Sequence, residues 1–189
     1  MAGPSSDRCA VPTVSAAWPV AILTVSDRCS QGLAEDTSGA WLAERLAGLP
    51  GEVVARACVA DEPDEVEGWL RTTLDALPVA LVVCTGGTGL HPRDRTPDAV
   101  RRVADYEVTG FGEAMRSLGV RHTPHAILSR QIAVVRRRSL IMALPGARQA
   151  VEESLEAVWA ALPHALEMVA GLPGASLPDA HGRGRPTLG

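Results

Sequence analysis

Short apolar runs alternate along this chain with longer segments in which apolar residues recur every three or four positions. The short runs are rich in β-branched residues, which favours strands buried on both faces. They lie at residues 18–25, 53–59, 79–84, 132–137 and 139–144. The longer segments predict amphipathic helices, which should separate most of these strands.

Helices are predicted at 36–49, 63–77, 111–118 and 147–170, with a short one starting at Thr96. Thr96 should cap that short helix and Pro97 should occupy its first position. Pro163 should kink the last helix near Trp159, because proline removes a backbone donor. The order of elements predicts an α/β fold: a three-layer α-β-α domain with a mostly parallel sheet.

Polar or glycine-containing motifs follow four of the predicted strands. In open parallel sheets ligands bind beyond the carboxyl ends of the strands, where the strand order reverses. The motifs that should meet at this edge are Ser26-Asp27, Asp61-Glu62, Thr85–Gly89 with Asp94, and Pro145-Gly146. Their convergence predicts a binding site there.

The segment Thr85-Gly86-Gly87-Thr88-Gly89 is the strongest of these motifs. Three glycines let the backbone approach a ligand, and backbone N–H groups with two threonine hydroxyls can cradle phosphate. A tight turn without a ligand is the alternative. The dinucleotide fingerprint fails because Pro92 replaces its last glycine, and the P-loop fails because all 18 basic residues are arginine.

Asp94 stands between Arg93 and Arg95 in the sequence, so its carboxylate should keep its charge. A fixed carboxylate beside a phosphate cradle is a natural Mg²⁺ ligand. A helix-start charge with a surface ion pair is the alternative. Asp61 begins a helix, and simple capping would explain it from the sequence alone.

Composition narrows the class of protein further. A length of 189 residues suits one domain, and a net charge of -4 argues against a general nucleic-acid binder. Four dispersed cysteines indicate reduced thiols, and no apolar run is long enough to span a membrane. We therefore expect a cytoplasmic protein with a domain at 18–171 and disordered segments at 1–17 and 172–189.

Several motifs together resemble the MoaB/Mog family of molybdopterin-binding proteins, which includes molybdopterin adenylyltransferases and the N-terminal domain of gephyrin. The resemblance runs from about residue 19 to residue 171. Its specific parts are TVSD at 24–27, TGGTG at 85–89 with RD-x-TPDA at 93–99, TPHAILSR at 123–130 and SLIMALPG at 139–146.

The resemblance implies Mg²⁺-dependent adenylylation of molybdopterin by ATP, with release of pyrophosphate. It assigns Asp94 and Asp61 to catalysis and Asp94 to the metal. The residues it places around the substrates are Ser26, Asp27, Ser38, Thr85, Gly86, Gly87, Thr88, Gly89, Ser139, Pro145 and Gly146. It further implies a homotrimer, and it allows contact with other proteins of molybdenum cofactor biosynthesis.

The chain departs from the family pattern after Gly146, where Ala147-Arg148-Gln149 replaces the usual small turn residues. This changes the expected substrate pocket but not the fold. A non-catalytic molybdopterin-binding or scaffold protein remains the main alternative, and both aspartates favour the enzyme over it. The broken dinucleotide fingerprint disfavours a nicotinamide oxidoreductase.

Overall fold

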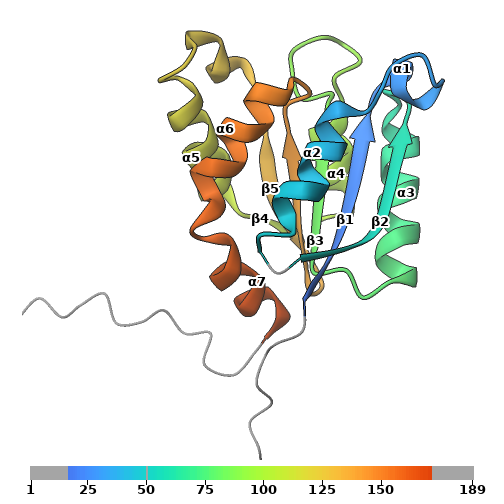
Figure 1. Cartoon of the computed structure of the whole chain (residues 1–189), viewed down its shortest axis with the longest axis vertical. Helices are drawn as coiled ribbons and strands as arrows, with labels where there is room; N and C mark the ends of the chain where they lie inside the picture. The colour runs from blue at the N-terminus through green and yellow to red at the C-terminus, as the bar shows by residue number, and fades with distance from the viewer. Residues whose placement is uncertain (1–16, 50, 172–189) are drawn as a thin grey trace, which may run out of the picture.

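Six strands form one sheet in the computed structural model, which describes residues 17–49 and 51–171 (Figure 1). The strands are β1 (Trp18–Val25), β2 (Gly51–Val59), β3 (Leu81–Thr85), β4 (Tyr106–Glu107), β5 (Ile132–Arg136) and β6 (Ser139–Leu144). All the strands expected from the sequence are present. The two-residue strand β4 was not predicted, because so short a segment carries no periodic signal.

The strand order is β2-β1-β3-β6-β5-β4. β1 is parallel to both β2 and β3, and β3 is parallel to β6, whereas β5 is antiparallel to its neighbours β6 and β4. The chain passes from β1 outward to β2 and then returns to form β3 on the other side of β1. The order therefore reverses between β1 and β3, which is where ligands bind in sheets of this kind.

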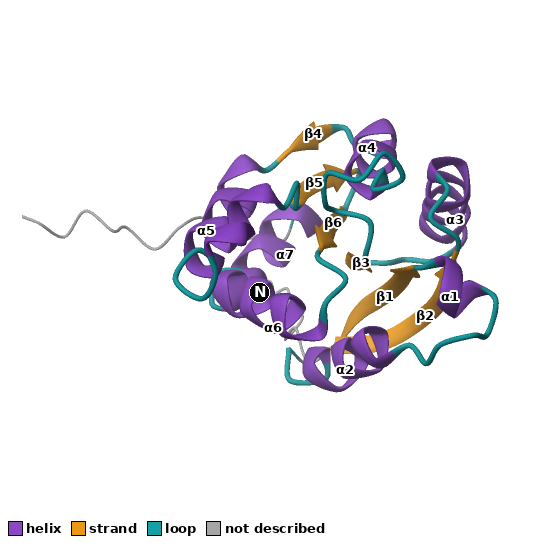
Figure 2. Cartoon of the chain, turned by 90° about the horizontal axis from the view of Figure 1, so that it is seen from above, coloured by secondary structure: helices purple, strands orange, loops and turns teal. Residues whose placement is uncertain are grey.

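Helices cover both faces of the sheet, so the predicted three-layer architecture is confirmed. The helices are α1 (Asp27–Ser30), α2 (Thr37–Leu46), α3 (Pro63–Ala76), α4 (Thr96–Val103), α5 (Thr109–Gly119), α6 (Arg148–Trp159) and α7 (Leu162–Ala170), with a 3₁₀ segment η1 (Pro124–Leu128). Figure 2 shows α3 and α4 on one face and α2, α5, α6 and α7 on the other.

Two apolar cores lie on the two faces of the sheet, because side chains alternate along each strand. In β1, Val20 and Ile22 pack with the α2 side chains Leu42 and Leu46. The intervening residues of β1 pack with α3 and α4 in the second core. These two layers hold the carboxyl ends of the strands, and the loops that follow them, in fixed positions.

The prediction of one kinked C-terminal helix was wrong. The chain forms α6 and α7 as separate helices, and Pro163 lies in the first turn of α7. Proline is well tolerated there because the first N–H groups of a helix have no intrahelical partner. The same residue that was expected to bend a helix instead begins a new one.

The expected cap of α4 was also wrong. Arg95 occupies the cap position without a capping side chain, and Thr96 is the first helical residue. A short helix that the sequence did not predict, α1, follows Ser26, whose hydroxyl accepts a hydrogen bond from the Cys29 N–H at 3.4 Å. The start of α4 and the presence of α1 both depend on hydrogen bonds made by the surrounding loops, which the sequence pattern does not show.

The expected disordered segments, apart from Ala17, lie outside the described residues. Within the part of the chain that the structure describes, no helix has the length and apolar character needed to cross a membrane.

Truncating Leu42 to alanine should lower the free energy of unfolding by about 2–5 kcal/mol. Leu42 is fully buried between α2 and the sheet, so the substitution removes packed methyl groups and leaves a cavity. Urea unfolding of the variant measures the loss. Leu33→Ala is the matched control, because Leu33 is 67% exposed and should change stability little. Equal losses in the two variants would contradict this account of the core.

Candidate functional site

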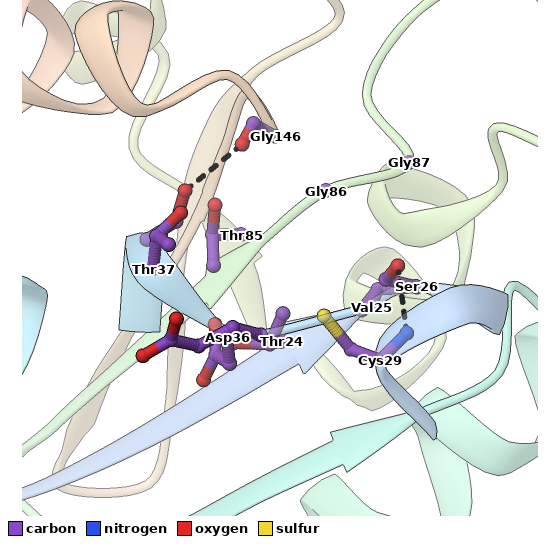
Figure 3. Close-up of a pocket in the computed structure, with 12 residues that line it drawn as sticks. Thr24, Val25, Ser26, Cys29, Asp36, Thr37, Thr85, Gly86, Gly87 and Gly146 are labelled. Carbon is purple, nitrogen blue, oxygen red and sulfur yellow. Dashed lines mark hydrogen bonds between the residues drawn. The ribbon is translucent and has the colours of Figure 1, made fainter. Parts of the chain in front are cut away.

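A cavity of about 270 Å³ lies at the carboxyl ends of β1 and β3, at the reversal in strand order (Figure 3). The start of α2 and the turn after β6 complete it. The lining residues are Thr24, Val25, Ser26, Cys29, Glu35, Asp36, Thr37, Ser38, Thr85, Gly86, Gly87 and Gly146. Six of these belong to the site residues expected from the sequence, so the predicted convergence of motifs at this edge is present in the fold.

The glycine loop passes very close to the end of β1. Gly86 has a φ of +105°, and a Cβ at this position would lie 2.2 Å from the Val25 carbonyl oxygen. Gly87 has a φ of +62°, and a Cβ there would lie 2.4 Å from the Thr96 hydroxyl. Only glycine fits either position without a backbone shift. A side chain at Gly87 would therefore strain the fold before it met any ligand.

Two hydroxyl side chains that line the cavity also fix the turn after β6. Thr85 donates a hydrogen bond to the Pro145 carbonyl at 2.7 Å, and Ser38 donates to the Gly146 carbonyl at 3.0 Å. The Gly86 N–H donates to the Leu144 carbonyl at 3.1 Å. These three bonds join the ends of β3 and β6 to the start of α2, so they set the shape of the cavity.

The two threonine hydroxyls, which were expected to cradle phosphate, already have partners within the protein. The Thr85 proton is already donated, and the Thr88 hydroxyl lies 3.3 Å from the Ser129 hydroxyl. The backbone N–H groups of Gly87, Thr88 and Gly89 have no acceptor among the described residues. A phosphate at this loop would be bound chiefly by backbone N–H groups, as in other anion-binding loops.

Asp36 organises the opposite wall of the cavity. Its carboxylate accepts hydrogen bonds from the Gly39 N–H and the Thr24 hydroxyl, both at 2.9 Å, and from the Arg56 guanidinium at 2.6 Å. Partial burial opposes ionisation, but these donors outweigh it and lower the pKa of Asp36. Asp36 thus caps α2 and also pairs with Arg56 of β2.

Asp27 and Asp61 bind each other's backbones across the ends of β1 and β2. The Asp27 N–H donates to one Asp61 carboxylate oxygen at 2.9 Å, and the Asp61 N–H donates to Asp27 at 3.1 Å. That backbone bond, together with the Arg93 guanidinium, lowers the pKa of Asp27. The other Asp61 oxygen, Oδ1, faces Gly87 and has no hydrogen bond within the described residues.

The expectation that Asp94 lies between two guanidinium groups was wrong. Arg93 pairs with Asp27 at 2.5 Å and with Glu62 at 3.0 Å, whereas Arg95 pairs with Asp98 at 2.8 Å. Arg93 turns toward acids at the starts of α1 and α3, which the sequence alone could not show, whereas Arg95 turns toward the first turn of the helix that it caps.

Asp94 is instead held against the glycine loop. Its oxygen Oδ2 accepts a hydrogen bond from the His91 N–H at 3.0 Å and lies 2.7 Å from where a Gly89 Cβ would be. Its other oxygen, Oδ1, has no hydrogen bond to any residue in the described part of the chain. Asp61 and Asp94 thus lie against alternate residues of one loop, each with one oxygen available.

Ser139 lies at the opposite edge of the sheet from the other candidate residues. It begins β6, whereas Pro145 and Gly146 follow the end of that strand. Its buried hydroxyl donates to the Val79 carbonyl at 2.6 Å. Ser139 is the first residue of the motif SLIMALPG, and Pro145 and Gly146 are the last two. The strand β6 separates these two ends of the motif, so Ser139 does not belong to this site.

The departure at Ala147-Arg148-Gln149 leaves the turn intact. The Arg148 side chain pairs with Glu152 at 2.6 Å and stacks over Trp41, with its guanidinium carbon 5.0 Å from the ring centre. It therefore belongs to the α6 surface and not to the cavity.

The residues present suit Mg²⁺ bound together with phosphate. No cluster of three or more His, Cys, Asp or Glu side chains that could hold a metal occurs within residues 17–49 and 51–171. Mg²⁺ does not require one, because it usually takes one or two carboxylates and completes its shell with phosphate oxygens and water. The unpaired Oδ1 atoms of Asp61 and Asp94, beside free backbone N–H groups, match that donor set.

The fold and the site define an α/β protein with a cavity at its switch point, lined in part by a glycine loop. The family model for a probable molybdopterin binding domain matches residues 21–164. The chain belongs to this family, as the sequence motifs indicated.

Known relatives agree with this assignment. A molybdopterin adenylyltransferase of Helicobacter pylori is 42% identical over 155 residues, which cover 80% of this chain and 88% of the relative. Gephyrin of Dictyostelium discoideum is 37% identical over 173 residues, 87% of this chain but only 24% of that longer protein.

Solved structures give the same result. The molybdopterin biosynthesis enzyme MoaB of Thermus thermophilus matches with a TM-score of 0.77 and 49% identity, over 82% of this chain and 98% of that chain. The comparisons support an enzyme of molybdenum cofactor biosynthesis.

Replacing Asp36 with asparagine should lower the free energy of unfolding at pH 7 and lower it less as the pH falls. The pKa of Asp36 is lower in the folded chain than its usual value near 4, so ionisation stabilises the fold above that pH. The stabilisation is lost as the pH falls through the lowered value. Urea unfolding between pH 7 and pH 3 measures the difference between the variant and the parent.

Glu35→Gln is the control, because the exposed Glu35 side chain makes no hydrogen bond to the described residues. A difference between Asp36→Asn and the parent that stayed constant down to pH 3 would show that the carboxylate charge does not stabilise the fold.

Proposed function

We propose that this protein adenylylates molybdopterin, using ATP and Mg²⁺ and releasing pyrophosphate. The observation that carries the proposal is the glycine loop: its free backbone N–H groups lie between two carboxylates that each keep one oxygen unpaired. The relatives named as molybdopterin adenylyltransferases support the choice of substrates.

In the proposed reaction, a terminal phosphate oxygen of molybdopterin attacks the α-phosphorus of ATP. The new P–O bond forms as the bond to the β-phosphate oxygen breaks, and the electron pair leaves with pyrophosphate. Such transfers need positioning and neutralisation of charge more than covalent help from the protein. Mg²⁺, when bound, supplies the positive charge that the phosphate oxygens require.

The chain's own residues have three roles in this proposal. The N–H groups of Gly87, Thr88 and Gly89 bind phosphate oxygens and orient them. Asp94 holds Mg²⁺ through its unpaired oxygen, and Asp61 assists from the neighbouring strand end. The cavity residues Ser26, Ser38 and Gly146, with Asp27 and Pro145 next to them in the chain, bind the remainder of the substrates.

A non-catalytic molybdopterin-binding or scaffold protein is the alternative. The similarity to part of a gephyrin keeps it open, because the chain corresponds to about a quarter of that protein. Release of pyrophosphate that depends on both ATP and molybdopterin favours the enzyme. Binding of molybdopterin without turnover favours the alternative.

The proposal extends to a cytoplasmic homotrimer, which could pass its product to other proteins of molybdenum cofactor biosynthesis. Large aromatic side chains such as Trp41 and Trp159 can anchor an interface, but Arg148 and Arg45 of the same chain stack over these two rings. An apolar groove of about 380 Å³ between β4, α5 and α7 supports it better. Tyr106 and Met168 line this groove and are 59% and 55% exposed.

Asp94→Asn should reduce turnover about 10²–10³-fold and leave the melting temperature nearly unchanged. Asparagine keeps an oxygen for the His91 N–H but removes the negative charge that would hold Mg²⁺. Pyrophosphate release in the presence of molybdopterin, ATP and Mg²⁺ measures the rate.

Asp64→Asn is the matched control, because the Asp64 side chain is 96% exposed on α3. Parent-like turnover in Asp94→Asn would exclude the metal-binding role of this carboxylate.

The full chain should elute as a particle of about three times 19.8 kDa in size-exclusion chromatography with light scattering. A charged residue in the groove, as in Met168→Glu, should shift the particle toward the monomer. A parent protein that is monomeric at micromolar concentration would contradict the trimer without affecting the proposed reaction.

A further inference from the structure

The segment after η1 runs to the edge of the sheet where the glycine loop lies and contacts this loop through two adjacent residues. The Ser129 hydroxyl lies beside the Thr88 hydroxyl, and the Arg130 N–H donates to the Thr88 carbonyl at 2.8 Å. This segment ends the motif TPHAILSR, for which the sequence suggested no role at the site. The Arg130 side chain makes the most extensive contacts of the segment.

The Arg130 guanidinium donates to three acceptors that belong to the loop or to the helix following it. Its Nε donates to the Gly89 carbonyl at 3.2 Å, and one terminal nitrogen donates to the Asp94 carbonyl. Both terminal nitrogens reach the Asp98 carboxylate in α4, at 3.3 and 3.2 Å. Together with its backbone bond to Thr88, Arg130 therefore holds the loop where it leaves β3 and again where it enters α4.

Between these two attachment points, Arg93 is the residue that pairs with other elements, through Asp27 and Glu62. Leu90, His91, Pro92 and Arg93 are all exposed, and residues 90–95 form no helix or strand. Turn bonds within the loop fix its local shape, including the bond from the His91 N–H to the Asp94 carboxylate. The position of the loop depends instead on bonds to other elements: Arg93 binds through its side chain, whereas Arg130 binds the backbone carbonyls of Gly89 and Asp94 on either side of the exposed residues.

The charge of Asp98 is shared by two arginines. Burial raises the pKa of Asp98, but hydrogen bonds and charge from Arg130 and Arg95 outweigh it and lower the pKa. Arg95 pairs with Asp98 at 2.8 Å and makes no side-chain bond to a loop carbonyl. The two arginines therefore differ in one respect: only Arg130 binds the carbonyls of Gly89 and Asp94.

We propose that Arg130 is a positioning residue for the reaction, which fixes the Asp94 carboxylate relative to the phosphate-binding N–H groups of the same loop. The proposal rests on the catalytic role proposed for Asp94. A planar guanidinium has five donors in a rigid arrangement and can bind two carbonyls and a carboxylate at once. A lysine ammonium could keep the pairing with Asp98 but could not hold this geometry.

The test compares Arg130→Gln and Arg130→Lys with Arg95→Gln, which removes the other partner of Asp98. For each full-length variant, the rate of pyrophosphate release is measured against the concentrations of ATP and Mg²⁺. Hydrogen–deuterium exchange of the peptide covering residues 88–98 and the melting temperature are measured without substrates.

Arg130→Gln should lower kcat by up to about 10²-fold, because small displacements of a catalytic group are costly. It should raise the Mg²⁺ concentration needed for half-maximal rate and speed exchange in the loop, while the KM for ATP changes little. Arg130→Lys should show the same changes in smaller degree. Arg95→Gln should resemble the parent in all four measurements.

Loop exchange and Mg²⁺ dependence that match the parent in Arg130→Gln would overturn the positioning role. Full rescue by lysine would overturn it as well, since charge alone would then suffice. A lower melting temperature with unchanged Mg²⁺ dependence would show that Arg130 only stabilises the fold. An inactive parent protein would refute the proposed reaction, and the exchange data would still decide whether Arg130 holds the loop.

Discussion

The site depends on one close approach between backbones, that of Gly86 to the end of β1. Gly86 has a φ of +105° and no Cβ, so the chain can leave β3 alongside the Val25 carbonyl while the Gly86 N–H bonds to β6. Any side chain here would push the loop away from both strands. The loop N–H groups that follow would then move relative to β1 and β3.

Arginine pairing determines the electrostatics around this loop. Arg56 holds Asp36, Arg93 holds Asp27 and Glu62, and Arg130 shares Asp98 with Arg95. These pairings neutralise acids at the rim, and among the described residues one oxygen each of Asp61 and Asp94 has no partner. The chain has no lysine, and an arginine side chain can bind several acceptors at once in a fixed geometry. These arginines can therefore hold loops in place as well as neutralise carboxylates.

The strands and the edge at which the motifs meet could be predicted because each depends on short-range patterns. The apolar run of β1 and the break at Gly86 are visible in a few consecutive residues. Predictions that depended on a distant partner fared worse. Arg93 was expected to lie beside Asp94, but it pairs with Asp27 in α1 instead, and Ser139 bonds to Val79 at the far edge.

The sequence by itself determined the α/β class, the glycine loop and the family, because hydrophobic periodicity and contiguous motifs are properties of neighbouring residues. Only the tertiary structure decided which side chains remain available. It bound the Thr85 hydroxyl to Pro145, left Asp61 and Asp94 each with an unpaired oxygen, and brought Arg130 onto the loop from 36 residues beyond Asp94. Hydrogen-bond partners are set by the packing of distant segments, and no local pattern in the sequence encodes them.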